Sequence, residues 1–180
     1  MNIPNLITIF RILLVPVTIW LIIAGAFGWA FIAFIAAGIS DGIDGFIAKQ
    51  FNMRTELGSY LDPLADKLLL VSIFLSLGFL QLAPAWLVIL IASRDVLIVG
   101  AVLLSRVLDK PVAMRPLMIS KVNTTAQILL AGGMLLALGL ASHPDRLLFA
   151  GCLIVAALTI ASGAAYMREW LRHMANGAKA

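Results

Sequence analysis

The chain has 180 residues, of which 62% are hydrophobic and 12% are charged, and its formal net charge is +4. A soluble domain averages about 45–50% apolar and about 25% charged residues, so this composition excludes an ordinary water-soluble enzyme and indicates a polytopic membrane protein. The single cysteine, Cys152, excludes an internal disulfide, and its apolar surroundings predict a small hydrophobic packing residue. The modest positive charge favours contact with anionic lipid over nucleic-acid binding.

Six apolar segments follow one another along the chain, and each is long enough to cross a hydrocarbon core of about 30 Å at about 1.5 Å per residue. They cover residues 5–25, 28–50, 60–81, 84–106, 119–140 and 146–170, with turn or polar residues between them. The first lacks the basic start of a signal peptide, so we expect a retained helix. The sequence predicts an all-α bundle of six transmembrane helices that forms one domain over residues 1–180.

The basic residues predict how this bundle is oriented. If the N-terminus lies inside, nearly all lysines and arginines fall at or toward the inner side, and only Arg146 falls outside. The positive-inside rule then places both termini inside. We expect an integral protein of a bacterial inner membrane, with its polar centre facing the cytoplasm.

Four aspartates lie in two pairs near the predicted inner ends of the second and third segments: Asp41 with Asp44, and Asp62 with Asp66. Spacings of three and four residues place each pair on one face of a helix. Each charge at mid-bilayer depth costs roughly 2.5–3.5 kcal/mol on insertion scales. Carboxylate oxygens suit hard divalent cations, and two such ions balance four negative charges. The four residues therefore predict a two-metal site.

Other interpretations of these acidic residues are open. Asp62 precedes Pro63, which is also the pattern of a helix N-cap followed by proline at the first helical position. This does not account for the other three aspartates. A cation transporter would also use intramembrane acids, but it would spread them along a pore, whereas these four gather at one predicted depth.

The motif Asp41-x2-Asp44-Gly45-x2-Ala48-Lys49-x8-Gly58-x3-Asp62-x3-Asp66 resembles the signature of the CDP-alcohol phosphatidyltransferase family. The resemblance implies transfer of a phosphatidyl group from a CDP-linked lipid to an alcohol, with release of CMP and help from two Mg²⁺ or Mn²⁺ ions. By position, Asp41, Asp44 and Asp62 resemble metal ligands. Asp66 resembles the residue that touches metal and also acts as the general base.

The same resemblance implies a binding surface for the CDP-lipid. Its candidate residues are Gly45, Ala48, Lys49 and Gly58, together with Asn5 and Thr8 of the first segment. Lys49 stands where the family usually has arginine. Lysine keeps the charge but loses the planar fork of two parallel donors.

Four basic residues are candidates for binding a phosphate of the acceptor alcohol: Arg11, Arg94, Arg106 and Lys121. Arg94 and Asp95 are neighbours on a predicted helix, where adjacent side chains do not face each other, so we expect each to pair elsewhere. A structural ion pair between helices is the alternative for these two residues. For Arg106 and Lys121 the alternative is anchoring at the cytoplasmic membrane surface.

The resemblance also bears on the acceptor. Ser93-Arg94-Asp95 and the stretch from Ile119 to Gln127 are more similar to the CMP-forming cardiolipin synthases than to the phosphatidylglycerophosphate synthases. This similarity implies CDP-diacylglycerol and phosphatidylglycerol as lipid substrates, and the alternative acceptor is glycerol 3-phosphate. The family resemblance further implies a homodimer.

Overall fold

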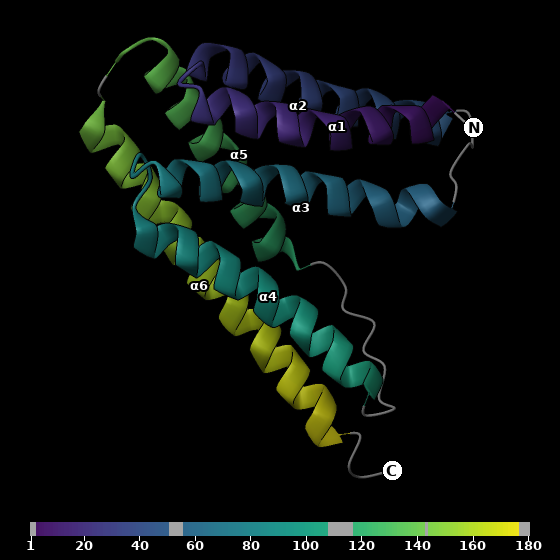
Figure 1. Ribbon diagram of the computed structural model, residues 1–180. Helices are drawn as coiled ribbons and strands as arrows, with labels where there is room; N and C mark the ends of the chain where they lie inside the picture. Colours follow the sequence, from purple (N-terminus) through teal and green to yellow (C-terminus); the bar gives the residue numbers. More distant parts are fainter. Residues whose placement is uncertain (1–2, 51–55, 108–116, 143, 177–180) are drawn as a thin grey trace. The chain divides into compact units, whose positions relative to one another are not determined.

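The computed structural model describes residues 3–50, 56–107, 117–142 and 144–176, and their side chains at 9–40, 67–105, 117–142 and 144–174 (Figure 1). Within these ranges the regular secondary structure is entirely helical. The helices are α1 (Ile3–Ile23), α2 (Phe27–Gln50), α3 (Glu56–Phe79), α4 (Ala85–Val107), α5 (Met118–Gly139) and α6 (Asp145–Asn176). The predicted all-α class is confirmed, and each of the six apolar segments corresponds to one helix. The largest difference is that α6 continues to Asn176 instead of ending near residue 170.

Three of the connections between helices are tight turns with the same backbone geometry. Gly25, Gln81 and Ala141 each follow a helix with a positive φ, of 73°, 59° and 49° respectively. In each turn the next residue donates its N–H to a carbonyl five residues earlier, at 2.8–2.9 Å. This is the bond of a Schellman motif, which satisfies helix carbonyls that would otherwise lack a partner. Only Gly25 adopts the left-handed conformation without a Cβ penalty.

The described chain forms two compact units. The first unit consists of Met1–Ala83 and Ala131–Asp145, so it contains α1, α2, α3 and the second half of α5. Within it, α1 packs against both α2 and α3. Its largest fully buried apolar side chains are Ile22, Ile73, Phe74, Leu77 and Leu135.

The second unit consists of Pro84–Leu130 and Arg146–Ala180, so it contains α4, the first half of α5 and α6. Leu87, Ile91 and Val155 are buried apolar residues of this unit. The unit also buries six polar or charged side chains, namely Arg94, Ser105, Asn123, Gln127, Thr159 and Ser162. These residues form the described part of the candidate site.

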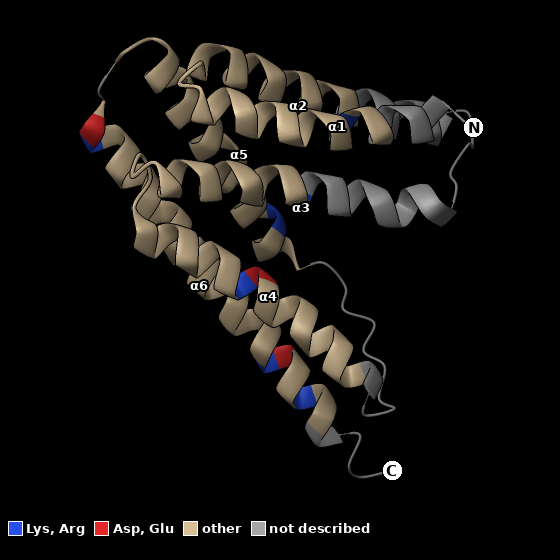
Figure 2. Cartoon of the chain, in the orientation of Figure 1, with Lys and Arg blue, Asp and Glu red and all other residues tan. Residues whose placement is uncertain are grey.

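The helix surfaces are those of an integral membrane protein. Among the described residues, Ala85–Ser105, Met118–Gly139 and Asp145–Met174 are long and apolar enough to cross a membrane, and α1, α2 and α3 contribute shorter apolar stretches. Charged residues are sparse along the described ribbon (Figure 2). Trp20 and Trp29 are 67% and 68% exposed, as expected of residues that meet the membrane interface. Cys152 is 2% exposed, which confirms its predicted packing role.

Candidate functional site

The helix bounds fix the local setting of the four aspartates. Asp41 and Asp44 fall within α2, and Asp62 and Asp66 fall within α3. Because α3 already begins at Glu56, Asp62 lies inside the helix, so the alternative of an N-cap at Asp62 is wrong. With each pair inside one helix, the spacings of three and four residues place its two members on a common face.

Most of the predicted donor-side site lies outside the described side chains. This applies to the four aspartates and to Gly45, Ala48, Lys49, Gly58, Asn5 and Thr8, and Arg106 of the predicted acceptor side lies outside them as well. Among the side chains that are described, no three His, Cys, Asp or Glu residues come together as a metal site. The predicted two-metal site therefore stays a prediction.

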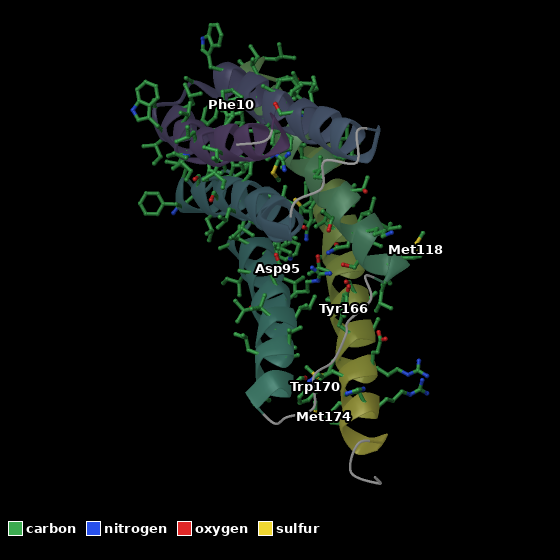
Figure 3. All side chains as sticks on the ribbon, turned by 90° about the vertical axis from the view of Figure 1, so that its right-hand side faces the viewer. Phe10, Asp95, Met118, Tyr166, Trp170 and Met174 are labelled. Carbon is green, nitrogen blue, oxygen red and sulfur yellow. The ribbon has the colours of Figure 1, made fainter. Side chains whose placement is uncertain are left out.

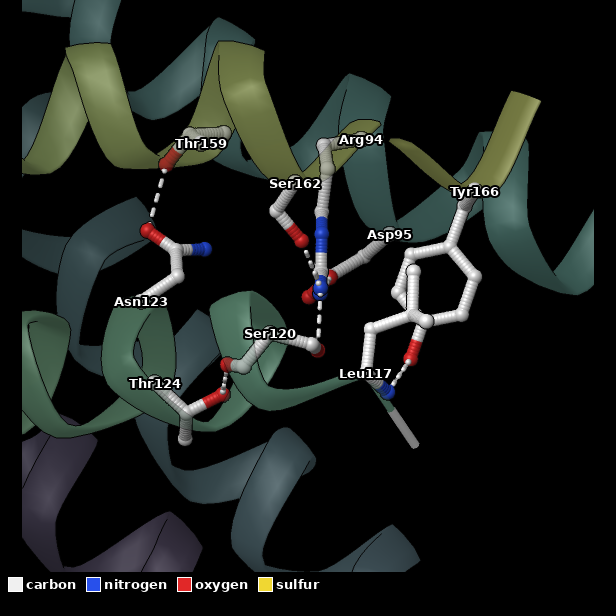
Figure 4. A network of polar contacts seen from close by, with 9 residues as sticks. All are labelled: Arg94, Asp95, Leu117, Ser120, Asn123, Thr124, Thr159, Ser162 and Tyr166. Carbon is white, nitrogen blue, oxygen red and sulfur yellow. Dashed lines mark hydrogen bonds and ion pairs between the residues drawn. The ribbon is translucent and has the colours of Figure 1, made fainter. Parts of the chain in front are cut away.

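The described part of the site is centred on Arg94 of α4, whose side chain is 5% exposed. Its Nη1 donates to the Asp95 carboxylate at 2.7 Å (Figure 4). Its Nη2 donates to the hydroxyls of Ser120 on α5 at 2.6 Å and of Ser162 on α6 at 2.7 Å. One guanidinium thus joins three helices of the second unit. We call these residues and Tyr166 the Arg94 network.

Tyr166 of α6 completes the Arg94 network from two directions. The Arg94 guanidinium carbon lies 5.6 Å from the centre of the tyrosine ring, within the range of a cation–π contact. The tyrosine hydroxyl accepts the backbone N–H of Leu117, one residue before α5 begins, at 3.3 Å. In Figure 3, Asp95 and Tyr166 lie between the ribbons of α4 and α6, while Met118 points outward. Tyr166 therefore fixes both the arginine and the start of α5.

A second polar contact lies one helical turn further along α5. Thr159 of α6 donates its hydroxyl to Asn123 Oδ1 at 3.0 Å, and both residues are almost fully buried. On the other side of the Arg94 network, Trp170 Nε1 donates to the hydroxyl of Ser105 on α4 at 2.8 Å. Buried polar groups need such partners, because an unpaired one costs about 1–3 kcal/mol.

The structure corrects one prediction for this region. Arg94 and Asp95 were each expected to pair elsewhere because neighbours on a helix do not face each other; Arg94 does reach Ser120 and Ser162, but the two residues also form an ion pair with each other. The long arginine side chain curves back to its neighbour while its second nitrogen reaches α5 and α6. The contacts of Arg94 between helices are thus made to hydroxyl groups.

The other candidate basic residues lie in different settings. Arg11 of α1 belongs to the first unit and is fully buried. Lys121 of α5 belongs to the second unit, as Arg94 does, but it is exposed. Within the second unit, the printed contacts of Arg94 thus join it to polar residues of α5 and α6.

Sequence reasoning missed the residues that α6 contributes. Thr159, Ser162 and Tyr166 all interact with the polar residues of α4 and α5. Their spacings of three and four residues place them on one face of an otherwise apolar helix. This periodic stripe of hydroxyl groups was the available signal.

Comparison with known proteins decides the family. Residues 1–165 match the CDP-alcohol phosphatidyltransferase family, which is more than nine-tenths of the chain. The chain belongs to this family. The match includes both aspartate pairs, Arg94 and Ser162, whereas Tyr166 and Trp170 lie beyond it. Three contacts of the second unit, two made by Tyr166 and one by Trp170, thus involve residues outside the family match.

Curated relatives in this CDP-alcohol phosphatidyltransferase family carry two kinds of name. The chain is 40% identical over 152 residues to a human cardiolipin synthase (CMP-forming), covering 76% of this chain and 50% of that protein. It is 36% identical over 151 residues to the CDP-diacylglycerol–glycerol-3-phosphate 3-phosphatidyltransferase of Bacillus subtilis, covering 75% of this chain and 77% of that protein. The chain spans about half the length of the human and rat cardiolipin synthases that it matches.

Proposed function

We propose that this protein is a cardiolipin synthase that transfers the phosphatidyl group of CDP-diacylglycerol to phosphatidylglycerol, with release of CMP. The observation that carries the enzyme class is the motif of four aspartates, at family spacing, in a chain whose family match covers residues 1–165. The cardiolipin synthases among its relatives support the choice of acceptor.

The four aspartate carboxylates fit two divalent cations, Mg²⁺ or Mn²⁺. Asp44 lies six residues before the end of α2, and Asp62 lies six residues after the start of α3. Asp41 and Asp66 lie nine and ten residues from the same two helix ends. If α2 and α3 run antiparallel, each pair brings one carboxylate to about 9 Å and one to about 14 Å from the helix ends. Four carboxylates at matched depths suit two such ions, and the bound ions would neutralise the pyrophosphate and stabilise the departing CMP.

The remaining donor-side residues have separate tasks in this proposal. Asp66 accepts the proton of the attacking hydroxyl, and Asp41, Asp44 and Asp62 hold the ions. Gly45, Ala48 and Gly58 leave room for the cytidine diphosphate to approach the helix backbone. Lys49, Asn5 and Thr8 contact its polar groups, with Lys49 acting as a single positive charge.

The proposed acceptor side uses Arg11, Arg94, Arg106 and Lys121. Arg94 is held rigidly by Asp95, Ser120 and Ser162, so its orientation is fixed before a lipid binds. Lys121 is exposed on α5 and free to turn toward a lipid phosphate. Arg94 has its charge largely balanced by Asp95 at 2.7 Å, so we assign it mainly to orienting the acceptor.

We further propose that the protein has six membrane spans, with both termini inside, and that it forms a homodimer. It would lie in a bacterial inner membrane, with its active site facing the cytoplasm. The distribution of basic residues supports the orientation. The tight turns at Gly25, Gln81 and Ala141 then all fall on the outer side.

The test is a product assay with purified protein, CDP-diacylglycerol and Mg²⁺ or Mn²⁺. Phosphatidylglycerol and glycerol 3-phosphate are offered separately, and the lipid products are identified by mass spectrometry. Cardiolipin and CMP are expected from the first acceptor. A phosphatidylglycerophosphate product without cardiolipin would contradict the proposal.

That contrary outcome is the second candidate function. It is favoured by the B. subtilis relative, whose name specifies glycerol 3-phosphate and of which the chain covers 77%. The two functions share the donor lipid and the aspartates, so only the acceptor separates them.

A further inference from the structure

Helices α5 and α6 of the second unit pack antiparallel in one continuous register. Leu117 meets Tyr166, Ser120 and Ser162 meet at Arg94, and Asn123 meets Thr159. Further along, a Cβ added at Gly151 would lie 2.9 Å from Leu130 Cδ1. Each step of three or four residues forward on α5 matches a similar step backward on α6, as expected of antiparallel helices.

This register leaves one polar residue opposite an apolar one. The position across from Gln127 is Val155, which is 1% exposed and has no polar side-chain atom. Gln127 is itself 3% exposed, and its Nε2 has no hydrogen-bond partner among the described residues. The same holds for Nδ2 of Asn123, although its Oδ1 accepts from Thr159. Two amide donors thus lie one turn apart on α5, both buried and both unpaired.

An oxygen atom of a bound ligand could accept hydrogen bonds from these two amide N–H groups. A buried amide without a partner costs about 1–3 kcal/mol, and a membrane helix would avoid this cost by carrying leucine or methionine there. In Figure 4 the amide nitrogen of Asn123 is directed away from Thr159, so the hydrogen bond to α6 does not use it.

The charge of the region indicates which kind of oxygen-containing group the two amides would bind. Asn123 and Gln127 are neutral, and the buried cation beside them, Arg94 of α4, which bonds Ser120 on the neighbouring turn of α5, is paired with Asp95 at 2.7 Å. A neutral, desolvated site accommodates an uncharged hydroxyl far better than a phosphate dianion, which needs an unbalanced cation. This favours an acceptor that ends in glycerol over one that ends in a phosphate monoester.

We propose that Asn123 and Gln127 form a neutral two-amide site that binds the glycerol hydroxyl oxygens of the acceptor lipid headgroup and thereby selects phosphatidylglycerol over glycerol 3-phosphate. The inference rests on the proposed function and adds the residues that determine its specificity. In this proposal Asn123 and Gln127 determine the specificity for the acceptor, and Asp66 accepts the proton of the attacking hydroxyl.

The experiment compares wild type with Gln127→Met, which keeps the shape but removes the donors. We expect kcat/KM for phosphatidylglycerol to fall about 3–10-fold, with KM for CDP-diacylglycerol within twofold and Tm unchanged or raised. Gln127→Lys adds a cation, and we expect it to lower the preference for phosphatidylglycerol over glycerol 3-phosphate about tenfold or more. Thr18→Val is the matched control, because Thr18 is buried in the first unit and its hydroxyl donates to Leu14 O of its own helix at 2.7 Å.

Three outcomes would overturn a part of this account, and they are distinguishable. If Gln127→Met raises Tm while kcat/KM for phosphatidylglycerol stays within twofold, the amides bind no acceptor. If kcat/KM falls equally for both lipid substrates, the residue is not specific to the acceptor. If wild type itself uses glycerol 3-phosphate alone, the proposed function fails, whatever the variants do.

Discussion

The two compact units of the chain differ in what their described interiors contain. Among the described residues, the first unit buries Arg11 and Thr18 as its polar or charged side chains, whereas the second buries six. In the first unit, small residues let backbones approach: a Cβ at Gly139 would lie 2.8 Å from Gly28 Cα. In the second, hydrogen bonds from Arg94 and its partners join the helices.

This difference agrees with the proposed function. In that proposal the first unit carries the four aspartates that hold two metal ions. The second carries a polar interior that is largely balanced within itself, and only a few donors remain for a ligand. Chemistry on the donor lipid and recognition of the acceptor should therefore respond to different mutations.

The largest expected effect tests the chemical role of the first unit. Asp66→Asn removes the proposed base, and general-base catalysis typically contributes about 10²–10⁴-fold. We expect CMP release to fall by at least that factor while circular dichroism shows unchanged helix content. Asp145→Asn is the control, because Asp145 lies exposed in the first turn of α6. Unchanged turnover in Asp66→Asn would contradict the assignment of Asp66 as the general base.

The second prediction tests whether the Arg94 network stabilises the second unit. Arg94→Met leaves the Asp95 carboxylate without this ion pair, and the half-buried Ser120 and the buried Ser162 without their donor; breaking a buried pair costs about 3–5 kcal/mol. We expect a clear loss of thermal stability in detergent. The double variant Arg94→Met with Asp95→Asn should recover part of it, because no charge is then left behind.

The control for this loss is Arg168→Met, since Arg168 is exposed on α6. Its effect should stay within about 0.5 kcal/mol. A double variant no more stable than Arg94→Met would mean that the carboxylate of Asp95 is not the source of the cost.

Sequence reasoning was effective where the information is local. The six helices follow from apolar segments bounded by turn residues, and the aspartate motif follows from spacings within two helices. The Arg94 network could not be predicted in this way, because it joins residues 26 and 68 positions apart. No pattern within one helix indicates which serine an arginine will reach, and a long side chain can also curve back to its neighbour, as Arg94 does to Asp95.

A third prediction tests the backbone packing of the first unit with two glycines. Gly139→Ala places a methyl group against the backbone of Gly28, and such overpacking typically costs about 1–3 kcal/mol. Gly38→Ala is matched to it, because Gly38 lies within α2 and a Cβ there meets no atom within 4 Å. Alanine should stabilise that helix by about 0.5–1 kcal/mol. Equal Tm changes for the two variants would show that close helix approach at Gly139 is not required.

The smallest expected effect concerns the far end of the second unit, beyond the family match. Trp170→Phe keeps an aromatic ring on α6 but loses the donor to Ser105 Oγ, and one hydrogen bond contributes about 0.5–1.5 kcal/mol. Ser105→Ala should cost a similar amount, and the double variant should cost less than the two changes added together, because both remove the same bond. Trp29→Phe is the control for loss of an indole, since Trp29 is 68% exposed in the first unit. If the two single changes simply add, Trp170 stabilises α6 by its packing alone, and the polar interior of the second unit ends at Tyr166.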